Sequence, residues 1–221
     1  LSAATTDRQK GKTTMAHELD MTNARANMAY VGETPWHGLG FPLNGTETIE
    51  EWKIAAGMNW DIKSFPATYI SDEDGGTLCE IPDRKVLVRS DSSAYLSTVS
   101  EGYKVVQPGE VLDFYADIVK RAGFTMETAG CLRGGRKYWA LARIGKDARI
   151  MGQDEIAGYL LLATSCDGSL ATTGMFTSVR VVCANTLGFA VQDGESGNAR
   201  QYIKIPHSRQ FDPEALKAEM G

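Results

Sequence analysis

The sequence predicts an α+β fold in which antiparallel β-hairpins form a curved sheet with helices packed on one face. Short apolar or alternating segments recur along the chain and are separated by glycine-rich turns such as Asp72–Gly76, a pattern typical of hairpins. Two longer segments place apolar residues at helical spacing. With 43% hydrophobic residues, the chain can bury a substantial core, so these elements predict a globular α+β domain.

The first half of the chain begins with a loop-rich stretch around Pro35–Gly40 and continues with helices and strands. Trp52 lies on the apolar side of the first expected helix, and Val111, Leu112 and Tyr115 contribute to the stripe of the second. The elements expected here are two helices, at 49–57 and 109–122, and three strands, at 59–70, 85–89 and 94–99.

The second half predicts further hairpins followed by helices. Two strands are expected at 124–132 and 137–144, joined by a glycine turn. The segment 158–191 reads as a strand from Tyr159 to Ala163, a polar turn with Asp-Gly, a second strand, and a helix that begins near Thr177 or Ser178. A last helix is expected at 213–220, with Asp212 as its candidate cap.

Composition sets the expected domain organisation. Residues 1–14 are polar and aperiodic, which predicts a disordered lead-in. Residues 15–205 are expected to form one domain, and 206–221 the truncated start of a C-terminal helical extension. No apolar run is long enough to cross a bilayer, and no secretory signal is recognisable. We therefore expect a cytoplasmic protein without a membrane partner.

Charge is unevenly distributed along the chain. The net charge is −5, and residues 15–119 hold 7 basic against 17 acidic residues. Residues 120–150 hold 8 basic against 2 acidic residues. This basic block indicates either a solvated face or a local contact for phosphates. The four cysteines are scattered and lack metal-ligand spacing, so we expect reduced thiols, no metal and no cofactor.

The segment Leu132–Trp139, LRGGRKYW, is the most suggestive part of the basic block. Gly134 and Gly135 favour a tight hairpin tip. Arg133, Arg136 and Lys137 flank this tip, and Tyr138 and Trp139 follow it. Cations beside aromatic rings suit single-stranded nucleic acid. The alternative is a solvent-exposed tip with Trp139 in the core.

Catalytic constellations are weak in this sequence. His37, in the segment WHGLG, lacks a matching nucleophile and an aspartate placed to orient it. Cys166 lacks a basic neighbour that would lower its pKa. No cluster of carboxylates suggests two-metal chemistry. We therefore expect a protein that is not an enzyme.

Three stretches carry a resemblance to a known family: ELDMTNARANMAYVGETPWHGLG, GGRKYWALA and YLLLATSCDGSLATTGMFTSVRVVCANTL. They resemble the phage/plasmid-like family of uncharacterised proteins of mobile elements. Members of that family usually have a histidine where Cys166 stands. The order of hairpins followed by a helix with a basic residue and an asparagine also resembles single-strand annealing proteins of the Rad-fifty-two, Redβ and RecT type.

The second resemblance implies a β-β-β-α core that assembles into rings or filaments and binds single-stranded DNA in a basic groove. It implies a phage or plasmid recombination protein that needs neither ATP nor a metal. The implied nucleic-acid-binding residues are Arg133, Arg136, Lys137, Tyr138, Arg143, Arg180 and Asn185.

Alternatives to this reading stay open. Arg180 could instead pair with an internal carboxylate, Asp167 or Glu155. The chain could be a non-enzymatic protein-interaction factor, for anti-defence or assembly, in which the basic block pairs with the acidic half of a neighbouring subunit. A nuclease would need carboxylates that only the fold brings together.

Overall fold

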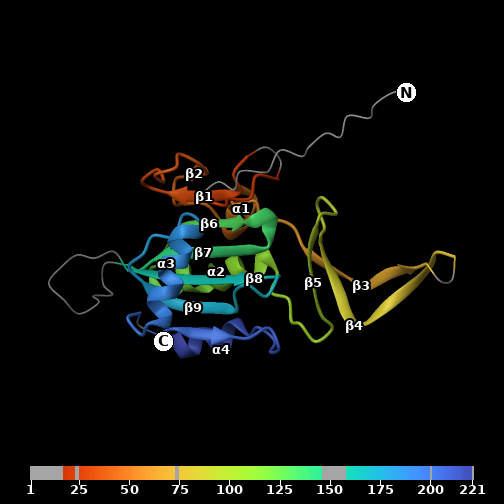
Figure 1. Ribbon diagram of the computed structural model, residues 1–221. Coiled ribbons are helices and arrows are strands. Elements are labelled where there is room, and N and C mark those ends of the chain that lie inside the picture. The colour runs from red at the N-terminus through yellow and green to blue at the C-terminus, as the bar shows by residue number, and fades with distance from the viewer. Residues whose placement is uncertain (1–16, 23–24, 73–74, 146–157, 200, 221) are drawn as a thin grey trace, which may run out of the picture.

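The body of the protein is a curved, open, mixed α+β domain built on a seven-stranded sheet (Figure 1). The computed structural model describes residues 17–22, 25–72, 75–145, 158–199 and 201–220. The predicted lead-in at 1–14 lies outside these residues. Within them, the sheet has the order β10-β9-β8-β7-β6-β1-β2, and every pairing is antiparallel except that of β1 with β2. Its strands are β1 (Met28–Val31), β2 (Phe41–Leu43), β6 (Thr125–Leu132), β7 (Lys137–Arg143), β8 (Tyr159–Ser165), β9 (Thr172–Thr177) and β10 (Ile203–Ile205).

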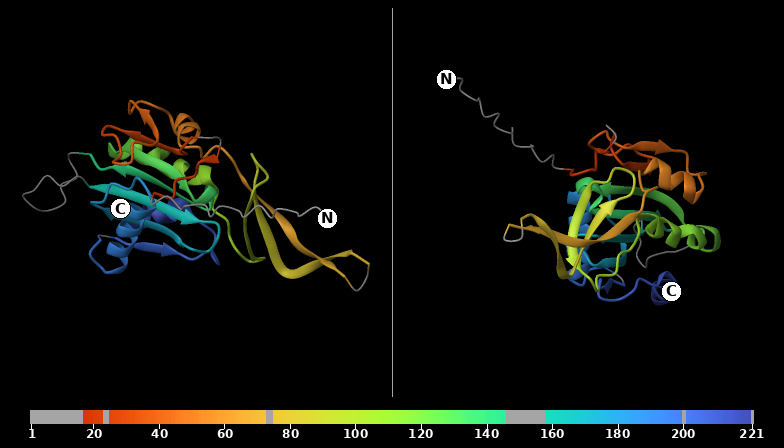
Figure 2. Two further views of the ribbon diagram at one scale, coloured as in Figure 1. Left: turned by 45° about the horizontal axis from the view of Figure 1, so that its top comes forward. Right: turned by 90° about the vertical axis from the view of Figure 1, so that its right-hand side faces the viewer.

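Helices cover both faces of this sheet, so the expectation of helices on one face is wrong. The described helices are α1 (Ile49–Ala55), α2 (Pro108–Ala122), α3 (Ala184–Glu195) and α4 (Pro213–Met220). One core joins Trp52 of α1, Leu112 of α2 and Leu216 of α4 to the sheet. The second core joins Leu187 of α3 to the opposite face, as Figure 2 shows from two sides.

Strand β7 illustrates why both faces need cover. Tyr138 and Ala140 belong to the first core, and Trp139 and Leu141 to the second. Successive side chains in a strand point to opposite faces. A central strand that is apolar at every position therefore requires a helix layer on each side.

The C-terminal helix belongs to this core and is not an extension beyond it. Leu216 and Met220 are buried in the first core. Asp212 caps the helix as predicted, because its Oδ1 accepts hydrogen bonds from the backbone N–H groups of Glu214 and Ala215, both at 3.0 Å. The boundary expected at residue 206 is therefore wrong.

A second, three-stranded sheet stands beside the body, in the order β3-β4-β5, with β3 (Ile62–Ser71), β4 (Thr77–Arg89) and β5 (Tyr95–Ser100). The hairpin of β3 and β4 projects away from the body and is called the arm here (Figure 1). Strand β5 pairs with Arg84–Val88 near the base of the arm. Strand β4 is longer than the predicted 85–89 and continues outward through Thr77.

A buried ion pair fixes the base of the arm to the body. Arg89 is 1% exposed and Asp20 is 2% exposed. Arg89 Nη1 donates to Asp20 Oδ2 at 2.7 Å and to the carbonyl of Gly134 at 3.2 Å. The Arg89 guanidinium also lies 4.0 Å from the centre of the Trp60 ring. The arm therefore leaves the body from a rigid point at the turn between β6 and β7.

Candidate functional site

The turn between β6 and β7 contains three successive residues in the left-handed region. Arg133, Gly134 and Gly135 have φ values of 53°, 69° and 90°. The connection has four residues, of which Arg133–Gly135 form a short 3-10 turn, so it is longer than the tight tip predicted from Gly134 and Gly135. At Gly135 an added Cβ would lie 2.6 Å from Arg89 Nη1. Position 135 must be glycine because the Arg89 guanidinium, which fixes the base of the arm, packs against it.

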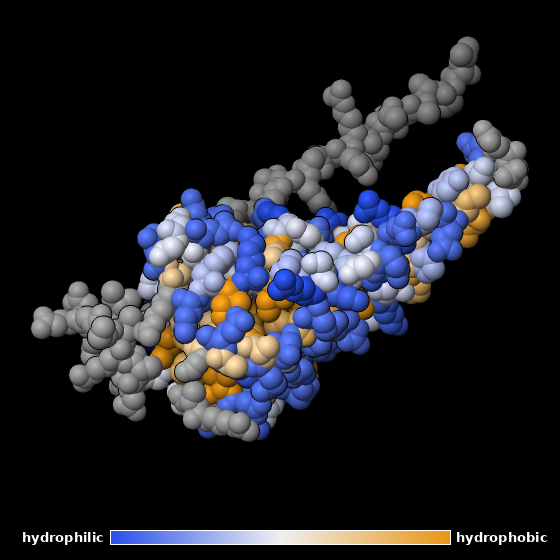
Figure 3. Space-filling model, turned by 90° about the horizontal axis from the view of Figure 1, so that it is seen from below, coloured by the Kyte–Doolittle hydropathy of each residue, from blue (hydrophilic) through white to orange (hydrophobic). Residues whose placement is uncertain are grey.

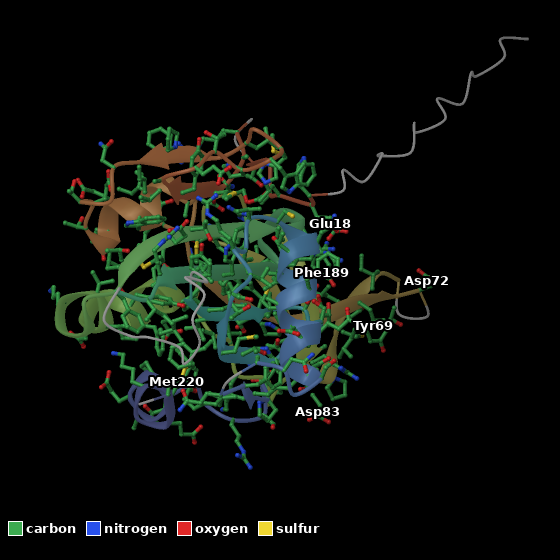
Figure 4. The ribbon with its side chains drawn as sticks, turned by 90° about the vertical axis from the view of Figure 1, so that its left-hand side faces the viewer. Glu18, Tyr69, Asp72, Asp83, Phe189 and Met220 are labelled. Carbon is green, nitrogen blue, oxygen red and sulfur yellow. The ribbon has the colours of Figure 1, made fainter. Side chains whose placement is uncertain are left out.

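A cavity of about 270 Å³ lies between this turn and α3. Figure 4 places Glu18 at one end of α3 and Phe189 on that helix. Its lining combines apolar and charged side chains. It is lined by Glu18, Leu132, Arg133, Lys137, Ser169, Leu170, Ala184, Leu187, Gly188, Val191, Gln192 and Glu195.

The cations of the cavity differ in how they are neutralised. Arg133 forms an ion pair with Glu18. Lys137 is half-buried, and within the described residues its ammonium forms no hydrogen bond or ion pair, although the carboxylates of Asp167 and Glu18 act on it from farther away. Burial, and then the nearby charge of Arg133, lower the pKa of the Lys137 ammonium. An anion placed beside the Lys137 ammonium would offset the repulsion from Arg133, as the carboxylates of Asp167 and Glu18 already do in part.

Two other predicted residues do not line the cavity. Arg136 is half-buried, and its side chain has no ion-pair partner among the residues described. Asn185 is exposed at the start of α3. Of the seven predicted residues, the structure thus places Arg133 and Lys137 in the cavity lining and Asn185 in the first turn of α3.

Arg143 and Arg180 lie outside the cavity, and both form ion pairs with one carboxylate, that of Glu127. Arg143 Nε donates to Glu127 Oε2 at 3.0 Å, and Arg180 Nε donates to Glu127 Oε1 at 2.5 Å. Arg180 also donates to the carbonyls of Glu33 and Val31, at 2.8 and 2.9 Å. Arg180 therefore pairs internally and is not a free phosphate contact. Its carboxylate is Glu127 and not Asp167, while Glu155 lies outside the described residues.

Arg180 is also not on a helix. Strand β9 runs to Thr177, and α3 begins at Ala184 with Cys183 as its cap. The prediction of a helix from Thr177 or Ser178 is wrong. The extended linker buries Val181, and this burial turns Arg180 toward Glu127.

The aromatic residues after the turn are not available for stacking. Tyr138 is 0% exposed, and its hydroxyl donates to the carbonyl of Val106. Trp139 is equally buried and donates through Nε1 to Thr128 Oγ1 at 3.1 Å. The stacking role expected for Tyr138 is therefore contradicted, and Trp139 occupies the core as the alternative interpretation held.

The residues considered for catalysis are used structurally. His37 Nδ1 accepts from the backbone N–H of Leu39 at 3.1 Å, so its Nε2–H donates to the carbonyl of Val182, also at 3.1 Å. Burial raises the pKa of the Cys166 thiol to about 12. Among the described residues, no three His, Cys, Asp or Glu side chains are grouped as metal ligands.

Sequence reasoning missed the arm as a surface. Ile70 and Leu78 are 66% and 67% exposed, and they are direct cross-strand partners near its tip. Tyr69 and Asp72 lie on the same outer part of the arm in Figure 4. Two apolar residues placed symmetrically around the Asp72–Gly76 turn were the available signal.

None of the helices in the described part of the chain has the length and apolar character needed to cross a bilayer. A family model described as Domain of unknown function (DUF932) matches residues 95–221. No curated protein matches the chain, and no solved structure matches it. None of these findings supports the resemblance to annealing proteins.

Proposed function

The chain belongs to the DUF932 family, and from that premise we propose that it is a non-enzymatic assembly protein that associates with further copies of itself through the arm. The observation that carries this proposal is the exposure of Ile70 and Leu78 at 66% and 67% on a projecting hairpin. A two-stranded hairpin is marginally stable alone in water. A partner that covers these side chains supplies a reason for the arm to exist.

Exposed apolar residues also occur nearer the base of the arm. Figure 3 shows apolar residues on the projecting hairpin as well as on the body. Phe65 and Tyr95 are exposed on the outer side of the three-stranded sheet, while Leu87 on its inner side is buried. Apolar side chains left exposed on a projecting hairpin are a feature of protein interaction sites.

The test is the mass of the protein in solution, measured by light scattering over a range of concentrations. One chain has a mass of 24.0 kDa. We expect a larger particle for the wild type and 24.0 kDa for Ile70→Asp/Leu78→Asp. The control Lys120→Glu changes an exposed residue of α2, away from the arm, and should assemble like the wild type. A wild type of 24.0 kDa at every concentration would overturn the proposal.

Binding of single-stranded DNA remains a second candidate because neither Arg136 nor Lys137 forms an ion pair in the part of the chain that the structure describes. Two phosphate contacts give a slope of about −1.4 for the logarithm of affinity against that of salt concentration. So few cations per chain would bind strongly only when several copies act together.

Fluorescence anisotropy of a labelled single strand at low and high salt tests this candidate. Arg136→Ala/Lys137→Ala should weaken binding and flatten its salt dependence. The matched control is Lys120→Ala/Arg209→Ala, which removes the same charge from exposed positions elsewhere. Equal loss in both double variants, or no binding by the assembled wild type at low salt, would exclude a specific site.

A further inference from the structure

We infer that the tip of the arm docks into the α3 cavity of a second copy, so that the chains assemble head to tail. This inference rests on the proposed self-association and names the surface that receives the arm. The tip is defined here as Ile70, Asp72, Leu78 and Glu80, and the receiving surface as the cavity between α3 and the β6–β7 turn.

The two surfaces match in apolar character. Ile70 and Leu78 are paired across the strands and therefore project from the same side of the arm. Leu132, Leu187 and Val191 contribute apolar side chains to the lining of the cavity. Docking would remove the two most exposed aliphatic side chains of the arm from water, which is the main favourable contribution to association.

The two surfaces also carry charged groups that can pair directly. Asp72 and Glu80 have no ion-pair partner among the described residues, and Glu80 follows Leu78 by two residues on β4. In the cavity, Arg133 pairs with Glu18 and Glu195 pairs with Lys204, whereas Lys137 has no ion pair among the described residues and only feels the carboxylates of Asp167 and Glu18 from farther away. An acidic side chain of the tip therefore supplies the direct ion pair that the half-buried Lys137 lacks.

Docking through side chains fits the arm better than pairing of strand edges. Strand β3 is an edge strand, but Pro66 interrupts its donors and the register shifts between Pro66 and Thr68. Strand β4 carries Pro82 in the segment beyond β5. Proline and bulges on an edge prevent its extension by another strand.

A tip and a cavity on different parts of one chain form a heterologous contact. Such a contact repeats from copy to copy and gives a ring or a filament, whereas contact between two identical arms would stop at a dimer. The arm points away from the body in Figures 1 and 2, so the cavity it reaches belongs to another copy.

Mixing two variants tests this inference. The tip variant is Ile70→Asp/Leu78→Asp. The cavity variant is Gly188→Glu/Gln192→Glu, which adds negative charge at two exposed positions of α3, and Gly188 has no atom within 4 Å of an added Cβ. We expect each variant alone to have the mass of one chain, and their mixture to form particles of two chains that grow no further.

The control for the cavity variant is Lys120→Glu, which changes the charge by the same amount on α2. Circular dichroism and urea midpoints like those of the wild type show that each variant is folded. If the cavity variant assembles like the wild type while the tip variant stays monomeric, the inference is overturned, and the arm remains an interface with some other surface. Two monomeric variants that stay apart when mixed would also overturn it.

Arg136 separates this inference from DNA binding, because it does not line the cavity. Arg136→Ala should leave the assembled mass unchanged. Loss of assembly in Arg136→Ala comparable to that of the cavity variant would contradict the assignment of the cavity as the receiving surface.

Discussion

Replacement of Arg89 by methionine is expected to destabilise the fold strongly. The guanidinium is buried against Asp20 and Trp60 and also donates to both carboxylate oxygens of Asp91, at 3.0 and 2.8 Å. Removing it leaves the Asp20 carboxylate, which is 2% exposed, without its cation. The loss of one partner from a buried pair costs about 3–5 kcal/mol, a large part of the roughly 5–15 kcal/mol that stabilises a domain.

Hydrogen bonds from Thr22 and Asn27 remain in that variant, so the carboxylate is not left bare. Urea unfolding followed by tryptophan fluorescence measures the free energy of unfolding. Asp20→Asn/Arg89→Met removes both charges and should recover part of the loss. The control Lys63→Met lies exposed on the same sheet and should change stability by no more than about 0.5 kcal/mol.

The pH dependence of the free energy of unfolding tests the same ion pair in a second way. Burial alone would raise the pKa of the Asp20 carboxyl, but hydrogen bonds from Thr22, Asn27 and Arg89 hold it below its ordinary value. Because its folded pKa is lowered, the ionised Asp20 carboxylate stabilises the fold above about pH 4. This stabilisation is lost as the pH falls through the folded pKa. In Arg89→Met the burial of Asp20 remains while the hydrogen bond from Arg89 is lost, so the folded pKa should rise and stability should begin to fall at a higher pH. A loss below about 1 kcal/mol at neutral pH, or a double variant no better than Arg89→Met, would refute the reasoning.

Three further predictions use the same unfolding assay. Glu127→Gln should cost about 2–3 kcal/mol because Arg143 and Arg180 lose their shared carboxylate, and a loss no larger than that of Arg143→Ala would contradict this. Gly188→Ala should add about 0.4–1 kcal/mol, since the new methyl group meets no atom within 4 Å in a helix interior. Burial, together with the charge of His37, lowers the pKa of His17. Its stabilising contribution is therefore present above about pH 6.5 and declines below it, and His17→Gln should flatten that decline in urea midpoints.

Elements with strong local signals were predictable from the sequence. Helix α2 follows its apolar stripe almost to the residue, because Pro108 fixes its first turn and Gly123 adopts the left-handed conformation that ends it. Helix α4 begins at Pro213, directly after its predicted cap Asp212. Strand β8 follows from an apolar run that is buried on both faces.

The start of α3 and the role of Arg180 depend on contacts that local sequence does not encode. Thr177 and Ser178 are acceptable caps, yet the cap forms at Cys183, whose backbone N–H donates to Thr186 Oγ1 at 3.0 Å. Arg180 meets Glu127 across 53 residues. Propensity could indicate a helix and a cation nearby, but tertiary pairing decided where the helix begins and which charges stay free.

The candidate site was half predictable for the same reason. The glycine turn drew attention to Lys137 and Arg133, which do line a cavity. The other wall comes from α3 and Glu18, more than 40 residues away in either direction, and no spacing rule connects them. The arm was missed because Pro82 and the charged residues around it obscure the alternation of β4.

The order of strands in the body has a consequence for dissecting this protein into fragments. The family match begins at residue 95, yet β1 and β2 complete the sheet beside β6, and Trp52 fills the core beneath it. A fragment cut at that boundary would leave β6 as a bare sheet edge and β5 without β4. Unpaired edges of this kind recruit other chains and aggregate. The segment that the family model matches is thus shorter than the sheet and the core of which it forms a part in this chain.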